Sequence, residues 1–120
     1  MGELAVLIVE DSRYAADVNA RQVQKAGYIV KYEIVSNKVE MIRLIQEQSW
    51  DLILSDHSLP AFSSLEALEI RNRYCPEVPF IIVTEYIGEK EHIVAIEGGC
   101  QEIIHKRELQ SLRRAVQNLV

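Results

Sequence analysis

The stretch DLILSDHSLP (residues 51–60) decides the fold. Its first half is a continuous apolar run, which is typical of a β-strand that is buried on both faces of a sheet. Strands of this kind occur mainly in parallel sheets that helices cover on both sides. The run ends at Asp56, and a charged side chain at such a place needs a partner or a chemical role. The stretch therefore predicts a parallel α/β protein and marks Asp56 as a candidate functional residue.

Four further strand-like runs surround this stretch. They are LAVLIV (4–9), IVKYEIV (29–35), PFIIVT (79–84) and CQEIIH (100–105). The run at 29–35 alternates between apolar and polar residues and is typical of an edge strand. Between the runs, apolar residues recur at helical spacing, as listed here: Val39, Ile42 and Ile45; Leu65, Leu68 and Cys75; Leu109, Leu112, Val116 and Leu119. The segment from Asp11 to Ala26 is less regular, because Asn19 and Gln22 interrupt its apolar stripe.

Five strands that alternate with five helices predict a three-layer α/β fold, because parallel neighbours need a helical crossover. The 120 residues contain no repeat or linker, so we expect one domain over residues 1–120. No apolar run approaches the roughly 20 residues that span a bilayer, and no signal peptide is recognisable, which favours a cytoplasmic protein. The formal net charge of −5 argues against direct binding of nucleic acid.

Chemically active residues follow the strand-like runs, at the edge where α/β sheets carry their sites. They are Glu10 and Asp11, Asp56, Thr84 and Lys106. Carboxylates that converge in this way repel one another and favour a hard divalent cation, which indicates Mg²⁺. Each residue also has a simpler explanation. Glu10 and Asp11 could serve the start of a helix, with Asp11 or Ser12 as its cap, while Thr84 could be an ordinary strand residue and Lys106 a solvated lysine.

Four motifs carry a resemblance to a known family. They are IVED (8–11), LILSDHSLP (52–60), IIVT (81–84) and GCQEIIHK (99–106). In this order and at these intervals they resemble the response-regulator receiver domains of two-component signalling. The segments LPAFSSLEAL (59–68) and IIVTEYIGEKEHIVAIEGG (81–99) are further similar to receivers attached to sensor histidine kinases. The resemblance covers essentially the whole chain.

This resemblance implies a flavodoxin-like (βα)5 fold with a parallel sheet in the strand order 2-1-3-4-5. It implies that Asp56 accepts a phosphoryl group, with Lys106 and Thr84 completing the catalytic group. It also implies that Mg²⁺ is held by Glu10, Asp11, Asp56 and the backbone carbonyl of Ser58. Such a domain is a signalling switch rather than an enzyme, and it catalyses only its own phosphotransfer and dephosphorylation.

The same resemblance implies the partners. A histidine kinase or phosphotransfer protein would supply the phosphoryl group, and a downstream protein or an attached module would receive the signal. No output module is recognisable in residues 1–120, and we expect no direct contact with nucleic acid or a membrane. A monomer or a weak homodimer is expected.

Several residues depart from the family pattern. Glu85 stands after Thr84 where receivers usually have a small residue, and Ile103 takes the place of the usual aromatic switch residue. Arg107 replaces a common proline, so the preceding peptide bond is expected to be trans. In an alternative register His105 rather than Lys106 would take the lysine position.

Two other functions remain open. The first is a phosphatase of the haloacid dehalogenase type, which also has a nucleophilic Asp after a strand but needs an acid two residues later, where this chain has Ser58. The second is a receiver-like interaction module that no longer depends on phosphorylation, which Glu85 and Ile103 favour. For His57, next to Asp56, we expect an exposed or packing role.

Overall fold

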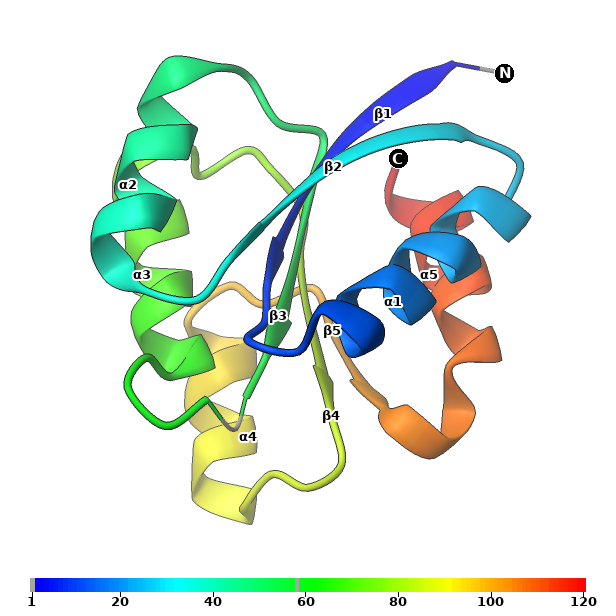
Figure 1. The fold of residues 1–120 in the computed structure, drawn as a ribbon. Coiled ribbons are helices and arrows are strands. Elements are labelled where there is room, and N and C mark those ends of the chain that lie inside the picture. Colours follow the sequence, from blue (N-terminus) through cyan, green and yellow to red (C-terminus); the bar gives the residue numbers. More distant parts are fainter. Residues whose placement is uncertain (1, 58) are drawn as a thin grey trace.

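A five-stranded parallel sheet forms the centre of the computed structural model, which describes residues 2–57 and 59–120 (Figure 1). The strands are β1 (Glu3–Val9), β2 (Ile29–Val35), β3 (Leu52–Asp56), β4 (Phe80–Thr84) and β5 (Glu102–His105). The helices are α1 (Arg13–Lys25), α2 (Lys38–Glu47), α3 (Ser64–Tyr74), α4 (Glu89–Glu97) and α5 (Gln110–Leu119), with a 3₁₀ turn η1 (Lys106–Glu108) before α5. The strand order is β2-β1-β3-β4-β5, as expected.

Each face of the sheet is covered by its own group of helices, because successive strand residues point to opposite faces. Helices α1 and α5 cover one face, and α2, α3 and α4 cover the other (Figure 1). The first core contains Val6, Ile8, Leu54, Ile81, Ala20, Leu112 and Val116. The second contains Leu7, Ile53, Phe80, Ile82, Met41, Leu68 and Ala95. The predicted three-layer α/β fold is therefore confirmed.

The sequence pattern was wrong in one detail of α2. Val39 was expected on the apolar stripe, but 78% of its surface is exposed. The buried residues of this helix are Met41 and Ile45, which lie four positions apart and share one face. Met41, rather than Val39, therefore packs against the sheet.

The two polar residues that interrupt the stripe of α1 both have a place in the packing. Asn19 is buried. Gln22 accepts a hydrogen bond from Arg113 Nε of α5 at 2.8 Å. These residues therefore belong to the side of α1 that faces the rest of the molecule. No helix in residues 2–57 and 59–120 is both long and apolar enough to cross a membrane.

A buried arginine ties α3 to the turn that ends α4. Arg71 is 3% exposed, and its guanidinium donates to the backbone carbonyls of Pro76, Val78 and Gly99. It also lies over the ring of Phe80. Gly99 has φ of +103°, a backbone conformation that favours glycine. These contacts fix the carboxyl end of α4, at the opposite end of β4 and β5 from the candidate site.

Candidate functional site

The carboxyl ends of β1, β3 and β5 bring three predicted residues into contact. Glu10 directly follows β1, Asp56 ends β3, and Lys106 directly follows β5. The Lys106 ammonium lies 3.2 Å from Asp56 Oδ2 and 3.7 Å from Glu10 Oε1. Because β1 and β5 lie on either side of β3 and β4, only the parallel sheet joins these distant parts of the sequence. One cation therefore bridges two carboxylates at the edge where a site was predicted.

Glu10 is almost completely buried, and its two carboxylate oxygens have different surroundings. Oε2 accepts hydrogen bonds from the backbone amides of Asp11 and Ser12 at 3.0 and 3.2 Å. Oε1 is buried, has no hydrogen-bond donor among the described residues, and lies 3.7 Å from the ammonium of Lys106. Burial, together with the negative charge of Asp56, raises the pKa of Glu10 to about 7, although the amide of Ser12 and Lys106 act in the opposite direction.

Lys106 is held as a cation by the carboxylates around it. Burial lowers its pKa, but the charges of Asp56, Glu10 and Glu85 outweigh this effect, and the net direction of the pKa is upward. Its side chain is 25% exposed, so it remains accessible from solvent. Lys106 is therefore not the fully solvated lysine that was considered as an alternative.

The donor set suits a hard cation, although the side chains are not gathered around one as they stand. The buried Oε1 of Glu10 and the carboxylate of Asp56 are hard oxygen ligands of the kind that Mg²⁺ prefers. Asp11 is exposed, and Ser58 lies outside the described residues. Within residues 2–57 and 59–120, no three Asp, Glu, His or Cys side chains are arranged to hold a metal ion. The chemistry of these carboxylate oxygens would fit Mg²⁺.

The helix-capping alternative applies to Ser12 and not to the acidic pair. Ser12 Oγ accepts from the amide of Ala15 at 3.2 Å and caps α1. Glu10 bonds the amides before the helix begins, and Asp11 is exposed. Capping therefore leaves both carboxylates available for another role.

Thr84 ends β4 and is buried, but its hydroxyl is engaged with the loop that follows. It donates to the carbonyl of Tyr86 at 2.8 Å and accepts from the amide of Tyr86 at 3.2 Å. The Tyr86 side chain itself is 74% exposed. In this structure the hydroxyl of Thr84 thus holds the β4–α4 loop.

His57 connects two helices, a role that the sequence did not reveal. Its Nδ1 lies 2.6 Å from Ser64 Oγ at the start of α3, and its Nε2 lies 3.2 Å from Glu91 Oε2 in the first turn of α4. The side chain is only 10% exposed, so of the exposed or packing role that was expected the structure shows packing. No local sequence pattern predicts this bridge, because Glu91 lies 34 positions away from His57 in the sequence.

The contacts at the end of β5 differ between His105 and Lys106, the two candidates for the lysine position. His105 is the last residue of β5, and its Nδ1 accepts from the amide of Arg107 at 3.0 Å. Lys106 instead reaches Asp56. The peptide bond before Arg107 is trans, as expected. Ile103 is partly buried against the core that α2, α3 and α4 form.

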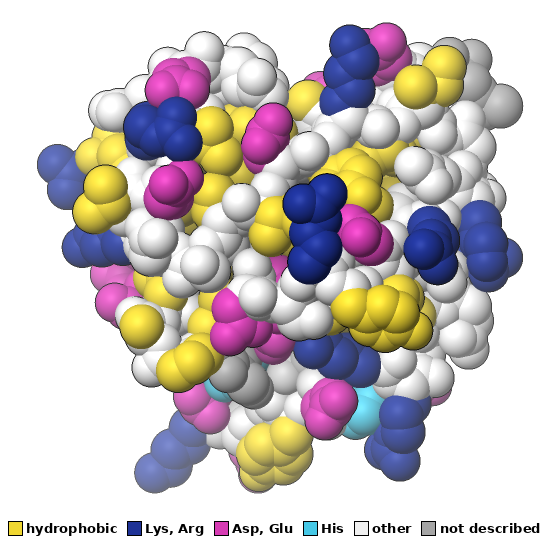
Figure 2. All heavy atoms as spheres, in the orientation of Figure 1, with side chains coloured by type: hydrophobic (Ala, Val, Ile, Leu, Met, Phe, Trp, Pro, Cys, Tyr) yellow, Lys and Arg dark blue, Asp and Glu magenta, His cyan; other side chains and the backbone are white. Residues whose placement is uncertain are grey.

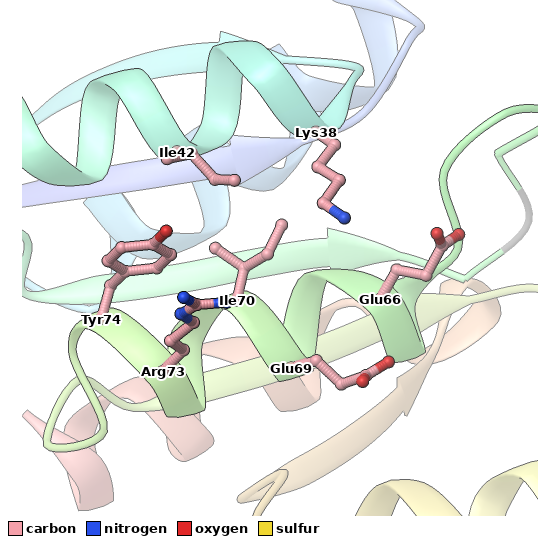
Figure 3. Close-up of a pocket in the computed structure, with 7 residues that line it drawn as sticks. All are labelled: Lys38, Ile42, Glu66, Glu69, Ile70, Arg73 and Tyr74. Atoms are coloured by element: carbon pink, nitrogen blue, oxygen red, sulfur yellow. The ribbon is translucent and has the colours of Figure 1, made fainter.

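Among the surface hollows of the described residues, one opens beside Lys106 and another lies between α2 and α3. A hollow of about 290 Å³ is lined by Tyr14, Asn19, Glu85, Lys106 and Leu109, among others, and thus opens beside the ammonium of Lys106. A pocket of about 240 Å³ lies between α2 and α3, where Figure 3 shows basic, acidic and apolar side chains around it. None of the seven residues that line this second pocket belongs to the predicted site.

Comparisons with known proteins show which family the chain resembles. The family model described as the response regulator receiver domain matches residues 6–117. A curated relative, hybrid signal transduction histidine kinase G of Dictyostelium discoideum, is 25% identical over 118 residues, which are 95% of this chain and 3% of that protein. The chain thus spans a small part of this relative's length.

Solved structures with the same fold include two from sensor kinases. The signal receiver domain of a signal transduction histidine kinase from Syntrophus aciditrophicus is 25% identical, with a TM-score of 0.80 over 97% of this chain and 89% of that chain. The receiver domain of a sensor histidine kinase from Pseudomonas aeruginosa is 21% identical, with a TM-score of 0.79 over 98% and 97%. That structure has a magnesium ion coordinated in its active site cleft.

Proposed function

The chain belongs to the response regulator receiver domains, and from this premise we propose that Asp56 accepts a phosphoryl group from a histidine kinase or a phosphotransfer protein. The observation that carries the proposal is the contact of Lys106 with both Asp56 and Glu10 at the carboxyl edge of the sheet. A buried acid and a cation beside a strand-end aspartate form a site that can stabilise the charge of a phosphoryl group as it is transferred to that aspartate.

In the proposed reaction an Asp56 carboxylate oxygen forms a bond to phosphorus while the bond between phosphorus and the donor's histidine nitrogen breaks. The product is an acyl phosphate on Asp56 and a free histidine on the donor. Lys106 lies within reach of the new phosphoryl oxygens, because its ammonium is already 3.2 Å from Asp56 Oδ2. A charge-assisted hydrogen bond from this ammonium would stabilise the negative charge that collects there.

Mg²⁺ is the cofactor that we propose, held by Glu10, Asp11, Asp56 and the backbone carbonyl of Ser58. When bound, such an ion neutralises charge on the transferring phosphoryl oxygens. Glu10 would present its buried Oε1, while Oε2 keeps its bonds to the backbone amides. The exposed Asp11 would have to turn inward.

Phosphorylation adds roughly −1.5 to −2 charges and strong hydrogen-bond acceptors at Asp56. We propose that Thr84 then donates to the phosphoryl group and that the β4–α4 loop, with α4, β5 and α5, changes its arrangement. The domain regulates a downstream protein or an attached module in this way. Hydrolysis of the acyl phosphate by water resets the site. The reaction belongs in the cytoplasm, where kinases of two-component systems present their phosphohistidine.

The experiment measures intact mass after incubation with acetyl phosphate, with and without Mg²⁺. We expect the wild type to gain one phosphoryl group only with the metal, and Asp56→Asn to gain none while its circular dichroism is unchanged. Asp51→Asn is the matched control, since Asp51 lies directly before the same strand and accepts from the amide of Ala5.

Two results would contradict the proposal. Phosphate uptake by folded Asp56→Asn would place the acceptor elsewhere. No adduct on the wild type, together with no binding of beryllofluoride, would favour the interaction module that does not depend on phosphorylation.

A further inference from the structure

The outer edge of the sheet is formed by β2, which pairs with β1 on one side only. At its two ends β2 uses odd-numbered residues to reach β1: the amide of Ile29 donates to Gly2, and the carbonyl of Val35 accepts from the amide of Glu10. Since backbone groups alternate in direction along a strand, the amides and carbonyls of the even-numbered residues 30, 32 and 34 point to the outer edge. β2 thus presents a row of backbone donors and acceptors to a further strand.

The sequence of β2, IVKYEIV, is symmetric about its centre. On either side of Tyr32 come one charge of opposite sign and then two branched apolar residues. If a second copy of the strand is placed antiparallel with Tyr32 opposite Tyr32, Lys31 of each copy stands opposite Glu33 of the other. Opposite charges at such positions attract, and like charges repel.

The hydrogen-bonding pattern independently selects the same register. With Tyr32 opposite Tyr32, residues 30 and 34 also stand opposite each other, and all of these have backbone groups that point outward. Lys31 and Glu33 then occupy the non-hydrogen-bonded pairs, where the Cα atoms are about 4.5 Å apart and side chains are closest. A shift by two residues in one direction would place Lys31 opposite Lys31, and in the other direction Glu33 opposite Glu33. A parallel pairing in register would place Lys31 opposite Lys31 and Glu33 opposite Glu33.

The edge is accessible in the structure. Ile29 is 63% exposed, and the Lys31 side chain is 75% exposed. Lys31 contacts Glu3 of β1 at 3.6 Å, whereas Glu33 has no ion-pair partner among residues 2–57 and 59–120. An open hollow of about 580 Å³ runs along the strand, lined by residues 30–34 and Arg13.

The view of the molecule agrees with an uncovered edge. Figure 1 shows β2 crossing the front of the sheet between α1 and α2, with no further strand outside it. Figure 2, from the same side, shows positive, negative and hydrophobic side chains next to one another on this face. A surface with positive, negative and hydrophobic side chains side by side can pair with a second surface that carries the same side chains in the opposite order.

We propose that the outer edge of β2 is a homodimer interface, in which a second copy adds its own β2 antiparallel about Tyr32 and the two sheets become continuous. The occupant is a second copy because the charge pattern is complementary to itself. One pair of strands buries less than the 1,200 Å² or so that stable interfaces need, so the dimer is weak and forms at high local concentration. It does not depend on phosphorylation.

Charge reversal tests the proposal by sedimentation velocity, from about 10 μM to about 1 mM protein, a range suited to weak complexes. Lys31→Glu and Glu33→Lys should each weaken association at least about tenfold, because each places like charges opposite each other. The double variant Lys31→Glu/Glu33→Lys should restore it. A mixture of the two single variants should form a heterodimer, because every opposed pair is then complementary.

Lys90→Glu is the matched control for charge reversal, since Lys90 is an exposed lysine on α4, away from β2. It should dimerise as the wild type does, and so should Asp56→Asn. Val30→Pro gives a second test, because it removes an outward amide without removing a bond to β1, and it should abolish dimerisation. Hydrogen exchange should show that the amides of residues 30, 32 and 34 gain protection as the concentration rises.

Three outcomes would overturn the proposal. One is a wild type that stays monomeric over the whole range. Another is a dimer that is lost in Lys90→Glu but retained in Lys31→Glu, which would place the interface on α4. The third is failure of both the double variant and the mixture to associate, with circular dichroism showing that each protein is folded.

Discussion

The Lys106 ammonium lies 3.2 Å from Asp56 Oδ2 and 3.7 Å from Glu10 Oε1. A monovalent cation of the chain itself thus contacts both carboxylates that are proposed to share a divalent one. Binding of the proposed Mg²⁺ would therefore compete with the contacts of Lys106 before phosphorylation. After phosphorylation the ammonium has the phosphoryl oxygens as alternative acceptors.

Lys106→Met separates these two roles of the lysine. We expect its Mg²⁺ affinity to rise about three- to tenfold, the equivalent of about 1 kcal/mol, because a competing cation is gone. Its rate of phosphorylation by acetyl phosphate should fall about 100-fold, since a stabilising donor is lost. Calorimetric titration and single-turnover rates measure the two effects. Arg107→Met is the control, and Mg²⁺ binding that weakens in Lys106→Met alone would contradict the competition.

Glu10 should make the metal-free protein less stable as the pH rises. Its pKa is raised from 4.5 to about 7 by burial and by Asp56, so the folded protein keeps this proton where the unfolded chain has released it. Between pH 4.5 and about 7 the free energy of unfolding should therefore lose a contribution on the order of 3 kcal/mol. Other acids titrate in the same range, so the comparison must be made with Glu10→Gln.

Glu10→Gln keeps an oxygen for the amides of Asp11 and Ser12 but carries no proton to lose. Urea unfolding in EDTA, at pH 5 to 8, should show the wild type losing stability relative to this variant as the pH rises. Glu69→Gln, at an exposed acid of α3, should run parallel to the wild type. Parallel curves for Glu10→Gln would show that Glu10 has no raised pKa.

Glu85 should slow phosphorylation by small anionic donors. It is exposed and lines the hollow beside Lys106, so its charge repels a phosphodonor that approaches through this hollow. Glu85→Ala should raise the rate with acetyl phosphate about two- to fivefold at low ionic strength, and the gain should shrink in 1 M salt. Glu89→Ala, an exposed acid on α4 outside this hollow, should change the rate little. If the phosphorylation rate rose equally in Glu85→Ala and Glu89→Ala, the effect would come from the net charge of the protein and not from the position of Glu85.

The bridge from His57 to Ser64 and Glu91 should hold the start of α4. His57→Ala removes the 2.6 Å contact of a buried hydroxyl, which costs about 1–3 kcal/mol of stability. Glu91→Ala should cost less than about 1 kcal/mol, because the Glu91 side chain is 52% exposed. Hydrogen exchange in the first turn of α4 should speed up in both variants and not in Glu89→Ala. Unchanged exchange in His57→Ala would mean that the bridge does not hold α4.

The sequence predicted those features that depend on the strand pattern. Continuous apolar runs and one alternating run gave the parallel sheet with β2 at its edge, and hence the positions of Asp56 and Lys106 at the strand ends. Features that depend on three-dimensional packing were not accessible. Neither the burial of Glu10 Oε1 nor the choice of Met41 over Val39 for the core follows from local spacing.

The hydroxyl of Thr84 has a single proton, which it now gives to the carbonyl of Tyr86. It cannot donate to a phosphoryl oxygen at Asp56 without releasing that carbonyl. A hydrogen bond from Thr84 to the phosphoryl group and the present conformation of the β4–α4 loop therefore exclude each other. Thermodynamic reciprocity then links them in both directions. A protein that captures the exposed Tyr86 in the released loop would shift the equilibrium toward the phosphorylated domain, and one that clamps the loop as it stands would shift it toward the unphosphorylated domain. The output partner would in this way bias the balance between the two states of the domain to which it responds.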